Sequence, residues 1–177
     1  MSREGKDKKD VNINEGLDSL KEALENYVKE NSSKDEEVVY TAYTFLQWLK
    51  KKTEIVQKEK TFEIPEGIEL KRGKVFWIDF GFNIGQEFGG KHPAIIYRVS
   101  GGQVFVFPLT TQEPDEEKPP FVKIPFVFDF PNMKRWVNVL NLKCVSINRI
   151  DFESCNGRVK PEFLKKIGEA WKEKGIR

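Results

Sequence analysis

The chain's only histidine, His92, lies in a glycine-rich segment beside other groups that can carry charge. The segment runs from Gly81 to Pro93 and holds four of the thirteen glycines, together with Glu87 and Lys91. An imidazole titrates near pH 6.5, so His92 can accept or give a proton at neutral pH. Lys91 can hold an anion as a point charge. The competing interpretation is a solvent-facing loop in which neither side chain has a partner.

Hydroxyl groups follow the second apolar run after this segment. The run Val104–Leu109 leads directly into Thr110, Thr111 and Gln112. A threonine hydroxyl can hydrogen-bond a phosphate oxygen, and a glutamine amide can both donate and accept. Because successive side chains of a strand point to opposite faces, we expect one of the two threonines to be functional and the other structural.

Aromatic and basic side chains elsewhere could support binding of a nucleic acid. Phe82, Phe88 and Trp136 are candidate platforms for stacked bases, although fourteen phenylalanines in a small chain make a core role the default. Lys134 and Arg135 follow a Pro-Asn-Met turn and form a modest candidate phosphate patch.

The distribution of charge favours an anionic partner for the larger part of the chain. Residues 1–70 contain 12 Lys and Arg against 16 Asp and Glu, whereas residues 71–177 contain 18 against 12. A basic body attracts polyanions, and an acidic appendage can compete with them. An ordinary solvated surface explains the charges equally well.

Neither a metal nor a cofactor is expected. The two cysteines, Cys144 and Cys155, have no metal-ligand spacing and form no disulfide framework. No cluster of carboxylates, histidines or thiols lies near the candidate residues. Cys144, within an apolar run, is interpreted as a small buried hydrophobic residue.

Short apolar runs with turn residues between them indicate the elements that must position these groups. A small antiparallel barrel of about five strands is predicted, because the runs are β-branched and aromatic and the connections are short. A terminal helix should begin at Pro161, a favoured first helical position. The expected strands are 75–80, 94–99, 104–109, 121–130 and 136–146.

The first seventy residues differ in composition from this barrel. We expect a disordered charged tail at 1–10, a helical hairpin at 11–60 and a linker at 61–70 before the barrel domain at 71–177. The apolar stripes of the hairpin should dock on the barrel or on a second subunit. With no signal peptide and no apolar run near 18 residues, no membrane contact and a cytoplasmic location are expected.

Three segments together resemble the MazF/PemK toxins of bacterial toxin–antitoxin systems. They are GKVFWIDFGFNIGQEFGGKHPAII, FPLTTQ and VSINRID, and the resemblance spans residues 71–174. It implies an SH3-like barrel that forms a homodimer and is blocked by a cognate antitoxin. It also implies metal-independent cleavage of single-stranded RNA that leaves a cyclic phosphate and a 5′-hydroxyl.

The resemblance assigns roles to individual residues. Glu87 and Pro93 match the loop glutamate and proline of the family, and Thr110 matches its catalytic threonine, with Thr111 and Gln112 beside it. His92 stands where the family has a catalytic arginine. The family's glutamine and arginine before its T-I-D motif are Lys143 and Val145 here.

The leading hypothesis is therefore an endoribonuclease toxin. His92, Thr110 and Glu87 are the candidate catalytic residues, and Glu87 could instead cap the glycine turn. The alternative is a non-catalytic binding module on the same barrel, either an inactivated relative or a gyrase-binding toxin of the CcdB type. The candidate RNA-binding residues are Lys91, Thr111, Gln112, Phe88, Lys134 and Arg135.

Overall fold

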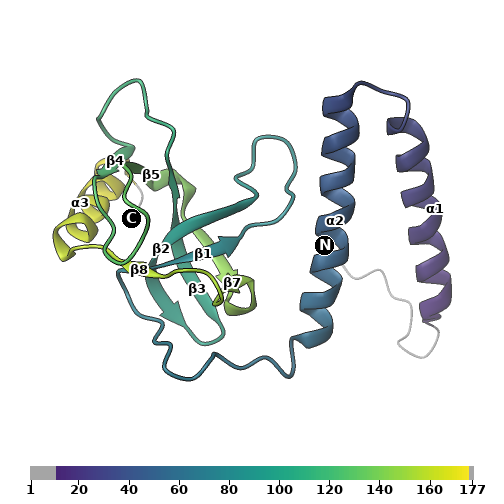
Figure 1. Ribbon diagram of the computed structural model, residues 1–177, viewed down its shortest axis with the longest axis horizontal. Helices are drawn as coiled ribbons and strands as arrows, with labels where there is room; N and C mark the ends of the chain where they lie inside the picture. The colour runs from purple at the N-terminus through teal and green to yellow at the C-terminus, as the bar shows by residue number, and fades with distance from the viewer. Residues whose placement is uncertain (1–10, 176–177) are drawn as a thin grey trace. The chain divides into compact units, whose positions relative to one another are not determined.

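The computed structural model describes residues 11–175 (Figure 1). The chain divides into two compact units, residues 1–50 and 51–177. The tail expected at 1–10 lies outside the described residues. The helices are α1 (Ile13–Asn31), α2 (Glu36–Lys58) and α3 (Pro161–Glu173). The strands are β1 (Lys74–Asp79), β2 (Lys91–Ser100), β3 (Gln103–Thr110), β4 (Phe121–Ile124), β5 (Arg135–Asn138), β6 (Lys143–Ser146), β7 (Ile150–Asp151) and β8 (Gly157–Arg158).

The two N-terminal helices form because their first turns are capped and their apolar residues recur at helical spacing. The Asn12 side chain accepts from the Asn14 backbone N–H at 3.0 Å, and the Asp35 carboxylate accepts from that of Val38 at 3.0 Å. The rings of Tyr27 on α1 and Phe45 on α2 meet edge to face with centroids 5.0 Å apart. The predicted pair of helices is confirmed.

The eight strands form one sheet, and every strand pair in it is antiparallel. Its strand order is β4-β5-β3-β2-β1-β7, with β6 also paired to β3 and β8 also paired to β1. One long strand, β3, pairs with β2 on one side; on its other side β6 pairs with its first half and β5 with its end. The predicted mainly antiparallel fold with a C-terminal helix is confirmed.

Alternation along the strands divides the core into two clusters of buried side chains. Ile95 and Phe107 belong to the cluster that α3 covers with Phe163, Ile167 and Ala170. Ile96 and Val106, their strand neighbours, belong to the other cluster together with Phe76 and Ile78. As predicted, α3 begins at Pro161.

Two predicted strands are shorter than expected. The run 136–146 is divided because the Asn138 side chain accepts from the Leu140 backbone N–H at 3.0 Å, and this bond supports a 3₁₀ turn at 139–141. The run 121–130 is a strand only as far as Ile124, since Pro125 has no N–H for a ladder. The short strands β7 and β8 were not predicted.

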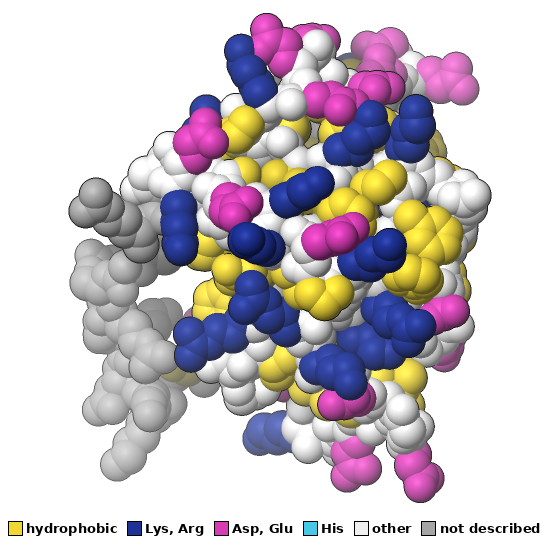
Figure 2. Space-filling model, turned by 90° about the vertical axis from the view of Figure 1, so that its left-hand side faces the viewer, with side chains coloured by type: hydrophobic (Ala, Val, Ile, Leu, Met, Phe, Trp, Pro, Cys, Tyr) yellow, Lys and Arg dark blue, Asp and Glu magenta, His cyan; other side chains and the backbone are white. Residues whose placement is uncertain are grey.

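Basic side chains are prominent on one face of the molecule. Figure 2 views the side on which Figure 1 places α3 and shows many Lys and Arg side chains across its middle, with hydrophobic and some acidic side chains between them and further Asp and Glu side chains toward the top and bottom. On α3 itself, Lys165, Lys166 and Lys172 contribute positive charge. Such a surface favours anionic ligands.

Candidate functional site

His92 lies on strand β2, and its prediction as an exposed loop residue is wrong. The strand begins at Lys91, three residues earlier than expected, because β1 continues to pair with it through Ile78↔His92 and Asp79↔Lys91. The imidazole is half-buried, with the ring of Phe88 packed 4.7 Å from it between centroids. Strand pairing therefore fixes the backbone of His92.

Burial and one backbone carbonyl set the pKa of His92. Burial lowers the pKa of the imidazole, and a hydrogen bond to the Leu109 backbone carbonyl opposes this effect without cancelling it. The net direction is down from the ordinary value, so the ring is neutral at neutral pH. A neutral imidazole keeps one nitrogen lone pair that can accept a proton.

Thr110 is the last residue of β3 and lies at the same end of the β2–β3 pair as His92. The β2–β3 ladder ends at Ala94↔Pro108, and His92 and Thr110 each stand two residues beyond that pair. The Thr110 hydroxyl accepts from the Gln112 backbone N–H at 3.1 Å. Paired strands thus place His92 and Thr110, the two residues expected to be central, at the same end of the sheet. Thr111 and Gln112 follow as exposed residues.

A cleft of about 610 Å³, which we call the Thr110 cleft, opens beside these residues. Phe88 lines it, so the ring that packs on His92 also forms part of its wall. Its acidic loop was foreseen only as a connection, and Asn138 and Asn141 were not foreseen as lining residues. The remaining lining residues are Thr110, Gln112, Glu113, Pro114, Asp115, Glu116, Lys118, Pro119, Pro120 and Phe121.

The glycine-rich loop that carries Phe88 is held by its own backbone. Gly90 donates to the Gly81 carbonyl at 2.7 Å, and the Asn83 side chain donates to the Phe88 carbonyl at 2.7 Å. A Cβ atom on Gly89 would lie 2.7 Å from the Gly81 carbonyl oxygen, so glycine is required there. The loop therefore has a defined shape beside His92.

Glu87 does not take either of the side-chain roles expected from the sequence. It is exposed, and within the described residues its carboxylate neither hydrogen-bonds His92 nor caps the glycine turn. Its backbone N–H donates to the Ile84 carbonyl at 3.2 Å. A catalytic role of Glu87 therefore requires direct contact between its carboxylate and a bound ligand.

Lys91 is paired with a carboxylate that the sequence motif contained but to which no role was given. Its Nζ lies 2.5 Å from Oδ2 of Asp151, which also accepts from the Ser154 hydroxyl at 2.6 Å. Burial raises the pKa of Asp151, but Lys91, Ser154 and the backbone N–H of Glu153 outweigh it and hold the pKa well below its usual range. Arg149, also in that motif, donates to the Phe80 carbonyl at 3.0 Å. The motif thus fixes the end of β1.

Arg135 is buried where a surface side chain was expected, and Trp136 is buried in agreement with its default core role. Arg135 is 2% exposed, and its Nη1 donates to the carbonyls of Pro131 at 3.0 Å and Met133 at 3.2 Å. Trp136 is also 2% exposed, which excludes it as a stacking platform. Of the predicted patch only Lys134 is exposed. Conversely, Cys144 is exposed rather than buried.

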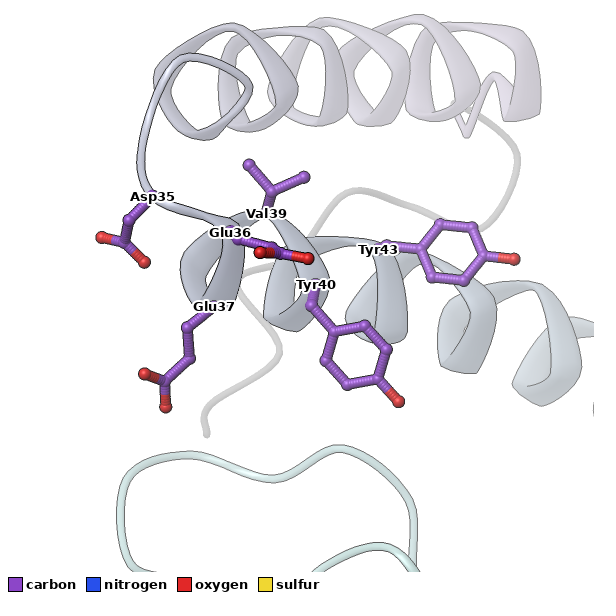
Figure 3. Close-up of a pocket in the computed structure, with 6 residues that line it drawn as sticks. All are labelled: Asp35, Glu36, Glu37, Val39, Tyr40 and Tyr43. Carbon is purple, nitrogen blue, oxygen red and sulfur yellow. The ribbon is translucent and has the colours of Figure 1, made fainter.

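A second hollow, of about 920 Å³, lies on the helical hairpin (Figure 3). Tyr40 and Tyr43 project from α2 beside Glu36 and Glu37, while Val39 points toward α1. The tyrosines are 69% and 58% exposed. This acidic and aromatic surface carries no nucleophile and base in contact, so it is not the candidate catalytic site.

The part of the chain that the structure describes contains neither a candidate metal cluster nor a helix suited to crossing a membrane. No group of three or more histidine, cysteine, aspartate or glutamate side chains within residues 11–175 could hold a metal ion. No helix in the same part of the chain combines the length and apolarity that a membrane crossing requires.

Comparisons with known proteins cover the sheet and α3. A family model described as PemK-like, MazF-like toxin of type II toxin–antitoxin system matches residues 71–173. Similar solved structures include MazF from Deinococcus radiodurans, at 17% identity and a TM-score of 0.45, covering 61% of this chain and 98% of that one. A MazE–MazF structure from the same organism has 16% identity and a TM-score of 0.40, covering 61% and 97%. No curated protein matches the chain.

Proposed function

Because the chain belongs to the PemK-like, MazF-like toxin family of type II toxin–antitoxin systems, we propose that it cleaves single-stranded RNA. The match to residues 71–173 confirms the resemblance seen in the sequence motifs and leaves the first seventy residues outside the family. Members of this family are generally endoribonuclease toxins. The observation that carries the proposal is the position of His92 and Thr110 at the same end of the β2–β3 pair, where the Phe88 ring both contacts His92 and lines the Thr110 cleft.

His92 acts as the general base in the proposed reaction. Its neutral imidazole takes the proton of a ribose 2′-hydroxyl, and the 2′-oxygen then attacks the adjacent phosphorus. The bond from phosphorus to the 5′-oxygen breaks, and that oxygen takes a proton from solvent. The products are a 2′,3′-cyclic phosphate and a 5′-hydroxyl. The lowered pKa of His92 supports the role, because the base form is present at neutral pH.

Thr110 stabilises the charge that develops on the phosphate. Its hydroxyl donates to a non-bridging oxygen, while its own oxygen keeps the contact with the Gln112 backbone N–H. Phe88 offers a half-buried ring for a base in the same cleft, and exposed Thr111, Gln112 and Lys134 offer polar contacts. Lys91 is available only in so far as the RNA competes with Asp151 for it.

The remaining expectations complete this proposal. The protein acts as a homodimer in the cytoplasm, without metal or cofactor, and a cognate antitoxin controls it. Family membership supports the antitoxin, since the family is defined by toxin–antitoxin systems. The barrel domain corresponds to residues 71–177, after the hairpin at 11–60 and the linker at 61–70.

A cleavage assay on the full chain tests the proposed function. Purified protein is incubated with a long single-stranded RNA in excess EDTA, and the fragment ends are analysed chemically. We expect cleavage with cyclic phosphate and 5′-hydroxyl ends. Cleavage that EDTA stops and added Mg²⁺ restores, or products with 5′-phosphates, would contradict the mechanism.

A non-catalytic binding module is the second candidate, and two observations favour it. His92 replaces the arginine of the family pattern, and the charge of Lys91 is engaged by Asp151. In that case the purified protein would bind RNA, or a protein such as gyrase, without cutting RNA under any metal condition. A protein with RNA-cleaving activity that His92→Gln removes would exclude this candidate.

A further inference from the structure

Strand β2 contains a bulge that turns one aromatic side chain toward α3. The β2–β3 register shifts between Ile96 and Arg98, so Tyr97 is the extra residue on β2. A bulge bends its strand and re-aims the side chain it carries. The Tyr97 ring meets Phe107 at 5.2 Å and Trp171 of α3 at 5.9 Å, both edge to face.

An arginine is held over the ring of Tyr97. The Arg72 guanidinium carbon lies 4.4 Å from the Tyr97 ring centroid, in cation–π contact. Arg72 is exposed, and no carboxylate in residues 11–175 forms an ion pair with it. The ring thus orients a planar cation whose outer face and N–H donors are open to solvent.

A cleft of about 770 Å³, which we call the Tyr97 cleft, is lined by Arg72, Tyr97 and Trp171. Lys165 and Lys172 of α3 also line it, and the one acidic lining residue, Glu169, lies 3.8 Å from Lys165. Gly168 has no side chain to fill the cleft. A Cβ atom at this position would lie 3.7 Å from the Tyr97 hydroxyl, in ordinary van der Waals contact. The cleft therefore combines aromatic walls with an excess of positive charge.

We propose that the Tyr97 cleft binds a nucleotide of single-stranded RNA that lies outside the scissile bond. Its phosphate contacts Arg72, Lys165 and Lys172, and its base stacks on the Arg72 guanidinium plane and the half-buried Trp171. The choice of RNA as the ligand rests on the proposed function. The basic face seen in Figure 2 supports an extended anionic partner.

A third hollow, of about 300 Å³, adjoins both clefts: it shares Pro119 and Phe121 with the Thr110 cleft and Glu169 with the Tyr97 cleft. Lys123 and Lys166 line this connecting hollow together with Glu169 and Glu173, and Lys123 already pairs with Glu117. One RNA strand can therefore follow adjoining depressions from the candidate catalytic residues to Tyr97.

Paired arginine variants test the charge of the Tyr97 cleft. The probe is a fluorescein-labelled 2′-O-methyl RNA of about 12 nucleotides, which cannot be cleaved through its 2′-oxygen, and the readout is anisotropy with the full chain. Arg72→Gln should raise the Kd about tenfold and reduce the slope of log K against log salt by about 0.7. Arg98→Gln, an equal charge change at an exposed neighbour of Tyr97 outside the cleft, should change the Kd less than about twofold.

A filled cleft gives a second test that does not depend on charge. Gly168→Leu should raise the Kd roughly fivefold or more, with an unchanged or higher Tm because leucine favours helix more than glycine does. Equal effects of Arg72→Gln and Arg98→Gln, or an unchanged Kd for Gly168→Leu, would overturn the proposal. Competition by a mononucleotide but not by longer RNA would also overturn it, since the site would then hold a free nucleotide.

The outcomes separate this proposal from the proposed function. If the protein cleaves RNA and the cleft variants bind like the parent chain, only the Tyr97 cleft proposal fails. If the expected variant pattern appears in binding while unmodified RNA stays intact, the nuclease proposal fails and the cleft stands as an RNA-binding site.

Discussion

His92 has its proton affinity set by contacts that the sequence does not display. Desolvation lowers its pKa, and the Leu109 backbone carbonyl opposes this effect without cancelling it. The sequence predicted that the segments carrying His92 and Thr110 converge, and the pairing of β2 with β3 brings these segments to the same end of the sheet. It could not predict the burial, which depends on the Phe88 ring.

The variant His92→Gln and the pH profile test the base together. Since the base must be unprotonated and its pKa is lowered, kcat/KM should fall on the acid side with a midpoint below about pH 6.5. The free energy of unfolding depends on pH in the same direction. The contribution of neutral His92 to it is complete above about pH 6.5 and is lost as the pH falls through the lowered folded-state pKa. The variant should lose roughly 10²–10⁴-fold in rate while an amide donor to Leu109 limits the change in Tm. A variant with the parent rate and the parent acid limb would exclude the role.

Thr110 and Thr111 form a matched pair for the hydroxyl. Thr110→Val keeps shape and removes the donor, so kcat should fall about 10²-fold. Thr111→Val, at an exposed position next to it, should change kcat less than about threefold. Single-turnover cleavage of one RNA by both variants is the measurement, and a larger loss for Thr111→Val would reverse the assignment of strand faces.

Among the elements, the short strand β7 has contacts that its sequence motif did not predict. The VSINRID segment pointed to the family, but the contacts of Asp151 could be seen only after β7 paired with β1 through Trp77↔Asp151. The division of 136–146 was similarly hidden, because it depends on one side-chain cap at Asn138. Long apolar runs predicted the existence of strands, whereas side-chain hydrogen bonds determined where they end.

Asp151→Asn should destabilise the barrel. Its carboxylate accepts from Lys91, from the Ser154 hydroxyl and from two backbone N–H groups, so its loss should lower the free energy of unfolding by about 1–3 kcal/mol. Because the folded-state pKa is depressed, this stabilisation is present above about pH 4 and is lost as the pH falls.

Tm measured against pH checks this prediction. The parent chain should lose Tm below about pH 4 more steeply than Asp151→Asn does. Glu153→Gln, an exposed neighbour, is the control and should follow the parent curve. Parallel curves for the parent and Asp151→Asn would show that the carboxylate does not set the acid stability.

The whole chain joins a basic family domain to an acidic hairpin with exposed apolar side chains. Leu17 and Leu20 on α1 are 48% and 52% exposed, and Tyr40 and Tyr43 on α2 are more so. Leu24, Leu46 and Leu49, which were expected to dock with Leu17, are half-buried. We propose that the hairpin lowers the RNA affinity of the barrel and that its exposed apolar groups supply the contact, since opposite net charge alone is screened by salt.

Removal of residues 1–63 tests this proposal. The truncated chain should bind RNA more tightly at low salt, with a smaller difference at high salt, and should be less soluble because covered apolar surface is exposed. A full-length Tyr40→Ser, Tyr43→Ser double variant is a second test of the same proposal, and it should bind RNA like the truncated chain. Unchanged affinity, solubility and oligomeric state after truncation would identify the hairpin as an independent module for another protein.

The pairing of β1 with β8 has a consequence for the order of events during synthesis. Lys74 pairs with Arg158, so the ladder joins residues about 84 positions apart. At about 5–20 residues per second, a ribosome takes roughly 4 to 17 s to add that length. The hairpin, whose contacts are local, can form within that interval, whereas β1 and β8 can pair only after Arg158 has emerged. A nascent chain therefore carries its acidic hairpin before the sheet around the candidate site can close.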